Sequence, residues 1–117
     1  MANVAITPFK TEKPNKAVAV TATALTSSGT GVITYPCKDA NTQIRLENTA
    51  GAANTVTFKA GNSHVAVNDL TIALASGETK VLGIDSARFL NLFGDNVGKI
   101  LVTCTGNLNI TVVETRV

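Results

Sequence analysis

The sequence is poor in charged and aromatic residues. Only 15% of its 117 residues are charged, against about 25% in an average soluble domain, and only 4% are aromatic, with no tryptophan. Ten Lys or Arg against eight Asp or Glu give a formal net charge of +2, too weak a bias to build a phosphate-binding stripe. Few rings are present for bases or sugars to stack on. We therefore expect no nucleic-acid partner.

Histidine and cysteine are also scarce, which leaves little material for a catalytic or metal site. The one histidine, His64, is expected in an exposed loop, and its neighbour Ser63 has no marked acidic partner to complete a triad. Cys37 and Cys104 lack the spacing of a zinc set, and we expect two small buried hydrophobic residues, with a bridge between them left open. No glycine-rich phosphate motif occurs. The sequence predicts no enzymatic activity, no metal and no cofactor.

Long apolar runs are absent as well. No window approaches the length of an apolar membrane span, and positions 1–16 lack the apolar centre of a signal peptide, so we expect no membrane contact and folding in a cytoplasm. The chain is nevertheless 44% hydrophobic, enough to give a chain of this length one core of its own.

The N-terminal segment, 1–16, is predicted to form an extended arm, separate from a β-domain over 17–117. Pro8 and Pro14 each remove a backbone donor, so neither a helix nor a central strand fits. Apolar residues stand beside lysines, as in a segment that docks on a neighbouring subunit; the alternative is a frayed terminus without a role. The predicted contact residues are Ile6, Phe9, Lys10, Lys13 and Lys16.

From Ala17 onward, apolar residues alternate with polar ones, which is the period of a β-strand. Gly, Ser and Asn clusters separate the runs, and residues 85–89 can form one helical turn that folds Phe89 onto the core. This pattern predicts an all-β fold: an antiparallel β-sandwich or jelly-roll-like single domain. The expected strands are 17–25, 43–48, 55–59, 70–74, 78–84, 99–105 and 109–113, the last three being central, with 29–35 as a weaker candidate.

The order of several segments is similar to that of a known group of proteins. These segments are IRLEN (44–48), NTVTFK (54–59), LTIAL (70–74), ASGETKVLG (75–83) and SARF (86–89). Over roughly residues 42–117 the chain resembles small tailed-phage head proteins that decorate or cement the capsid. The resemblance implies a β-sandwich without enzymatic activity that binds the major capsid protein and assembles in the host bacterial cytoplasm. It also implies many copies on the outer capsid surface of the virion, often as homotrimers, that stabilise the capsid.

Two other functions fit the same composition. One is a tail, fibre or other structural virion subunit, which would polymerise without a capsid. The other is a carbohydrate-binding β-sandwich, which needs an exposed aromatic platform; Tyr35 is the only ring outside the phenylalanines. Neither alternative requires a catalytic residue.

Overall fold

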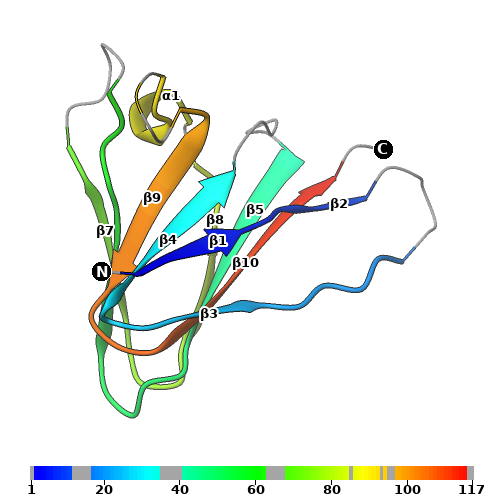
Figure 1. Cartoon of the computed structure of the whole chain (residues 1–117). Helices are drawn as coiled ribbons and strands as arrows, with labels where there is room; N and C mark the ends of the chain where they lie inside the picture. The colour runs from blue at the N-terminus through cyan, green and yellow to red at the C-terminus, as the bar shows by residue number, and fades with distance from the viewer. Residues whose placement is uncertain are drawn as a thin grey trace.

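Two five-stranded sheets account for most of the described chain (Figure 1). The computed structural model describes residues 2–11, 17–34, 41–62, 68–84, 86–92, 94 and 97–115. Its elements are β1 (Ala2–Ile6), β2 (Phe9–Thr11), β3 (Thr23–Leu25), β4 (Gly29–Thr34), β5 (Thr42–Asn48), β6 (Asn54–Phe58), β7 (Leu70–Leu74), β8 (Thr79–Leu82), α1 (Ser86–Phe89), β9 (Lys99–Cys104) and β10 (Leu108–Thr115). The predicted all-β sandwich is confirmed.

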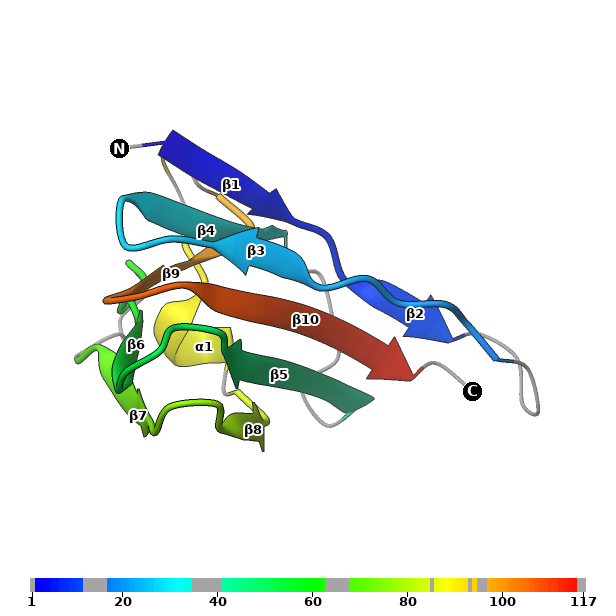
Figure 2. The ribbon, with the colours of Figure 1, turned by 90° about the horizontal axis from the view of Figure 1, so that it is seen from below.

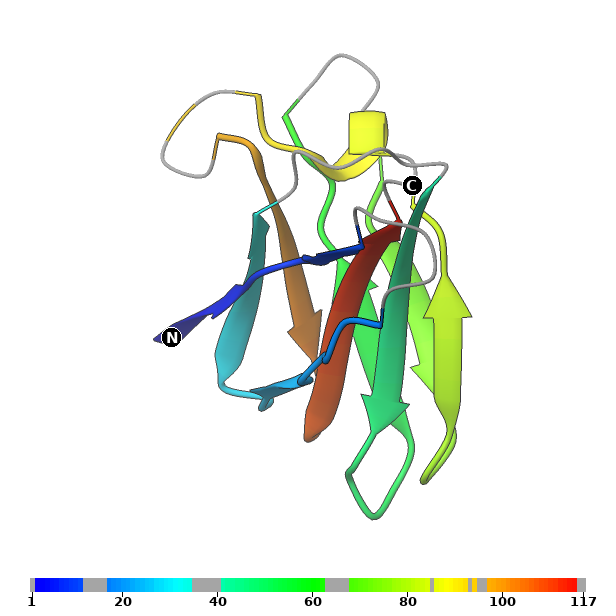
Figure 3. The same cartoon turned by 90° about the vertical axis from the view of Figure 1, so that its right-hand side faces the viewer.

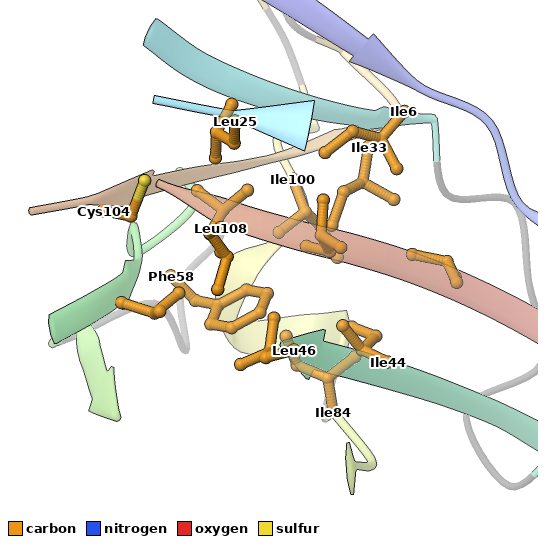
Figure 4. Packing of buried hydrophobic residues seen from close by; sticks show 14 of the residues in the cluster. Ile6, Leu25, Ile33, Ile44, Leu46, Phe58, Ile84, Ile100, Cys104 and Leu108 are labelled. Atoms are coloured by element: carbon orange, nitrogen blue, oxygen red, sulfur yellow. The ribbon is translucent and has the colours of Figure 1, made fainter. Parts of the chain in front are cut away.

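Alternation along the strands places the core between the two sheets. In β5, residues Thr42, Ile44, Leu46 and Asn48 are buried, and the intervening side chains are exposed or half-buried. Each fully buried Ile, Leu or Phe contributes about 1.5–3 kcal/mol relative to an exposed side chain. Figure 4 shows these side chains meeting from both sheets around Phe58. The part of the core contributed by β5 therefore follows from the period-two pattern.

Strand order separates the molecule into sheet A and sheet B. Sheet A has the order β1-β4-β9-β6-β7, and sheet B has the order β2-β10-β5-β8, with β3 also pairing with β10. Among the described strands, all pairings are antiparallel except β1 with β4 and β2 with β10, which are parallel. Both parallel pairs involve the N-terminal strands, which the sequence did not assign to a sheet.

The N-terminal segment passes from sheet A to sheet B between β1 and β2. β1 lies in sheet A, Pro8 follows it, and β2 lies in sheet B (Figure 2). Because proline has no N–H to give to a ladder, pairing stops there and the chain can change sheets. The prediction that no central strand forms here agrees with the structure, since β1 and β2 are both edge strands.

Three sequence predictions differ from the structure in detail. The weaker candidate at 29–35 is β4, which lies inside sheet A between β1 and β9. The run at 78–84, expected to be central, contains β8, an edge strand in which Val81 is 56% exposed. Of residues 17–25, only Thr23–Leu25 form a strand. The predicted helical turn is α1, and Phe89 is buried as expected.

Candidate protein-binding surface

The predicted docking arm is part of the sandwich as far as Thr11. β1 pairs with β4, and the Ile6 side chain is only 1% exposed in the core. A Cβ placed on Gly31 would lie 2.8 Å from Ile6 Cδ1, so the missing side chain of Gly31 makes the space that Ile6 fills. The separation into a 1–16 arm and a 17–117 domain is therefore corrected. Ile6 serves the core and presents nothing to a partner.

Phe9 and Lys10 are half-buried in β2 rather than presented on a free arm. Lys10 stands opposite Glu114 in the β2–β10 register, with Lys10 Nζ 4.0 Å from Glu114 Oε1. The Glu114 side chain is fully buried, and a buried carboxylate needs a nearby cation or hydrogen-bond donors. Lys10 thus has an internal role. The other two predicted contact residues, Lys13 and Lys16, lie outside the described residues.

The outward side of sheet B offers a different candidate surface. Alternation turns Arg45 and Glu47 of β5 away from the core, and the register places Arg45 between Thr111 of β10 and Val81 of β8. We call this face the outer surface of sheet B. It consists of Gln43, Arg45, Glu47, Val81, Asn109, Thr111 and Val113.

A short extended segment crosses this surface. Residues 17–22, here called the outer segment, leave the sheet before β3 and pass in front of β10 (Figure 3). Between the outer segment and the sheet lies an open hollow of about 120 Å³, lined by Val20, Ala22, Arg45, Glu47, Asn109 and Thr111. Val18 is 39% exposed and Val20 48% exposed. The hollow can take one medium-sized side chain of another molecule.

Charge on the outer surface of sheet B comes from Arg45 and Glu47. They are two residues apart on one strand, and neither forms an ion pair with another described residue. An arginine presents several donors in a fixed plane that matches a carboxylate, and a glutamate accepts from a lysine or arginine. Exposed Val20 beside a cation and an anion that have no ion-pair partner among the described residues combines the apolar anchor and steering charges that protein interfaces use.

Alternation in the sequence predicts that Arg45 and Glu47 face outward, so the contribution of β5 to this surface could be predicted. The contribution of the outer segment could not be predicted, because the same alternation predicts that residues 17–22 belong to a half-buried strand. No sequence signal showed that this segment leaves the sheet and stays exposed.

The residues considered for catalysis, metal binding or sugar stacking offer no assembled site in the described chain. His64, Ser63, Cys37 and Tyr35 lie outside the described residues. Among the residues described, no three of His, Cys, Asp or Glu gather as a metal site, and the Cys104 thiol is free and buried. Of the described rings, Phe58 and Phe89 are buried and Phe9 is half-buried. No helix among the described residues has the length and hydropathy to span a membrane.

A scan against models of known protein families, a search of curated proteins and a search of solved structures each found no match. Function is therefore inferred from the residues of this chain.

Proposed function

We propose that this chain is a structural virion protein that decorates and stabilises the outer surface of a phage capsid by binding major capsid protein subunits. Two observations support the proposal. The first is the resemblance of residues 42–117 to small tailed-phage head proteins. The second, which carries the binding role, is the outer surface of sheet B, where exposed Val20 lines one hollow together with Arg45 and Glu47, which form no ion pair with another described residue.

The layout of that surface suits binding more than catalysis. Interfaces gain most of their affinity from a few anchors in a desolvated centre, and arginine is common among them. Here Val20 and Arg45 line a space large enough for a partner's side chain. Because β5 and β10 are paired from Thr42 to Asn48, the groups beneath the hollow are held rigidly and lose little entropy on binding.

Stabilisation of a shell follows from mass action. A protein that binds assembled capsid subunits and has no affinity for separated ones shifts the equilibrium toward the shell. If the chain forms a homotrimer, several weak contacts engage together, and avidity exceeds single-site affinity by about 10²–10⁴. A small binding surface on each subunit is then sufficient to stabilise the shell.

The test is binding to capsids. Purified protein is mixed with empty heads assembled from the major capsid protein encoded in the same genome, and co-sedimentation and the capsid disassembly temperature are measured. We expect saturable binding and a higher disassembly temperature. The double variant Val20→Asp, Arg45→Glu should bind at least roughly tenfold more weakly, since it places a charge in the hollow and reverses another. Val97→Asp is the control, because Val97 is at least as exposed as Val20 (55% against 48%) but lies outside this surface.

The alternatives give different results in the same preparation. Tubes or fibres formed by the purified chain without capsids would indicate a tail or fibre subunit. Specific binding on a glycan array would indicate a carbohydrate-binding module. Absence of capsid binding at micromolar concentration would reject the decoration role, and equal loss in the Val97→Asp control would reject the outer surface of sheet B as the contact.

A further inference from the structure

The outer edge of β10 is shared by two short strands that come from opposite directions. β3 pairs antiparallel with the start of β10, from Leu108 to Ile110. β2 pairs parallel with its end, from Val113 to Thr115. Thr111 and Val112 lie between these two pairings, and β5 occupies the other edge of β10 from Leu108 to Glu114.

The outer segment (residues 17–22) is the direct continuation of β3, yet it takes part in no strand pairing within the described chain. Its departure has a steric cause, because β2 already occupies the edge of β10 that a longer β3 would follow. If the β3–β10 register continued, the further pairs would be Ala22–Thr111, Thr21–Val112, Val20–Val113, Ala19–Glu114 and Val18–Thr115. The last three positions are those that β2 now takes.

We infer that β2 and the outer segment are alternative occupants of one strand edge, so that release of the N-terminal strands lets residues 18–22 join β3 in a longer antiparallel strand on β10. Only one of the two can donate to and accept from Val113–Thr115 at a time. The exchange happens within one chain and does not depend on the proposed capsid partner.

The side chains of the outer segment are compatible with the alternative pairing. Antiparallel alternation would keep Val18 and Val20 on the outward side, where Val20 would face Val113 as a β-branched pair. Ala19 would face inward opposite Glu114, and its small side chain adds no bulk to the core. Val18, Val20 and Thr21 are residue types enriched in strands, which favours the extended geometry that the alternative pairing requires.

Two contacts of the N-terminal strands favour β2 over the outer segment at the edge of β10. Lys10 faces the buried Glu114, and β1 carries Ile6 into the core just before the crossing at Pro8. Against these stand two gains of the alternative: antiparallel pairing, which is slightly more stable per residue than parallel pairing, and partial cover for two exposed valines. A molecule that binds residues 2–11 would shift the population toward the alternative state.

The exchange is testable with pairs of cysteines in the full-length chain carrying Cys37→Ser and Cys104→Ala. Facing positions in adjacent strands have Cα atoms about 4.5–5.5 Å apart, within the range for a disulfide. Phe9→Cys with Val113→Cys reports the pairing described, and Val20→Cys with Val113→Cys reports the alternative. Val18→Cys with Val113→Cys is the control, because it is out of register in the alternative pairing.

We expect the Val20/Val113 pair to oxidise within one chain, more slowly than the Phe9/Val113 pair and clearly faster than the control. Adding Ile6→Ala should accelerate it by roughly tenfold or more, because truncating a buried isoleucine removes more than about 1.4 kcal/mol from the anchoring of β1. In the crosslinked protein, whichever of the Lys10 and Thr11 amides donates to β10 should lose its protection and exchange rapidly with deuterium.

Several results would overturn the inference. One is a Val20/Val113 pair that oxidises no faster than the control while the Phe9/Val113 pair forms normally. Another is a disulfide found only between two chains. The third is continued protection of that same β2 amide in the crosslinked protein, which would show that both segments fit beside β10 together.

Discussion

Asn54 donates from Nδ2 to Oδ1 of Asn48 at 3.3 Å, in a buried contact that joins the two strands flanking the β5–β6 turn. Both side chains are almost completely buried, at 1% and 2% exposure. Asn48 also donates to the carbonyls of Ala52 and Ala75, and Asn54 Oδ1 accepts from the backbone N–H groups of Thr105 and Gly106. Two amide side chains thus tie three turns together at one end of the sandwich.

Replacing Asn54 with alanine should therefore destabilise the protein strongly. The change removes the Asn54 acceptor of the Gly106 N–H, and it takes one of two hydrogen bonds from Asn48 Oδ1 and from the Thr105 N–H, which keep Ala50 and Thr55. A buried group left without a partner costs about 1–3 kcal/mol. We expect the free energy of unfolding in urea to fall by about 2–4 kcal/mol. Asn107→Ala is the control, since its side chain is exposed and its backbone carbonyl is kept. Equal losses in the two variants would contradict the role of the buried amides.

A second stability prediction concerns the close approach of β1 and β9 at Gly31. A Cβ there would lie 2.6 Å from Val102 Cγ1 and 2.8 Å from Ile6 Cδ1, closer than packed carbon atoms approach. Gly31→Ala should lower the free energy of unfolding by about 1–3 kcal/mol through overpacking. Gly51→Ala is the matched change at a site with no atom within 4 Å, and it should be nearly neutral. A neutral Gly31→Ala would show that β1 is not held against β4 as described.

The strands that sequence predicted well are those in which side-chain alternation coincides with burial. β5 is such a case, because its charged residues fall on the outward face and its apolar residues all fall inward. Phe89 is another case, since burying the large apolar ring of a lone aromatic residue is strongly favourable and the core is the nearest apolar environment.

The pairing partners of the N-terminal strands β1 and β2 could not be read in the same way. The contact of Ile6 with Gly31 joins positions far apart in sequence, and no local pattern specifies which strand an edge segment will meet. For the same reason, alternation over 17–25 places Val18 and Val20 on the apolar side of a half-buried strand, whereas both are exposed. Their exposure depends on β2 occupying the edge of β10, a competition between segments that periodicity does not encode.

Cys104 provides a chemical test of burial. Desolvation raises the pKa of its thiol above the ordinary value of 9.0, although a hydrogen bond from the Gly106 backbone acts in the opposite direction. Since the thiolate is the reactive form, Cys104 in a Cys37→Ser variant should react slowly with iodoacetamide at pH 8 and quickly in urea. Mass spectrometry of the labelled chain measures both rates. Rapid labelling of the folded protein would contradict the buried position.

The same pKa shift sets the sign of a pH effect. A raised pKa means that the unfolded chain loses its Cys104 proton first as pH rises, so ionisation favours unfolding above pH 9.0 and is without effect well below it. The urea midpoint should therefore fall above pH 9.0 more steeply for the Cys37→Ser variant than for Cys37→Ser, Cys104→Ala. Parallel curves for the two variants would contradict this contribution.

Lys80 protects an open sheet edge. Within the described chain, β8 pairs with β5 only and β7 pairs with β6 only, so each has one side without a strand partner. Lys80 Nζ donates to the carbonyl of Ala73 in β7 at 2.9 Å and lies 3.9 Å from Glu78 Oε1. A lysine held at this place blocks the approach of another chain's strand, because docking would bury its charge. Lys80→Thr should therefore associate beyond the wild-type oligomeric state at high concentration. Light scattering with Lys59→Thr as the charge-matched control measures this, and identical association of both variants would show that net charge, rather than the position of Lys80, prevents it.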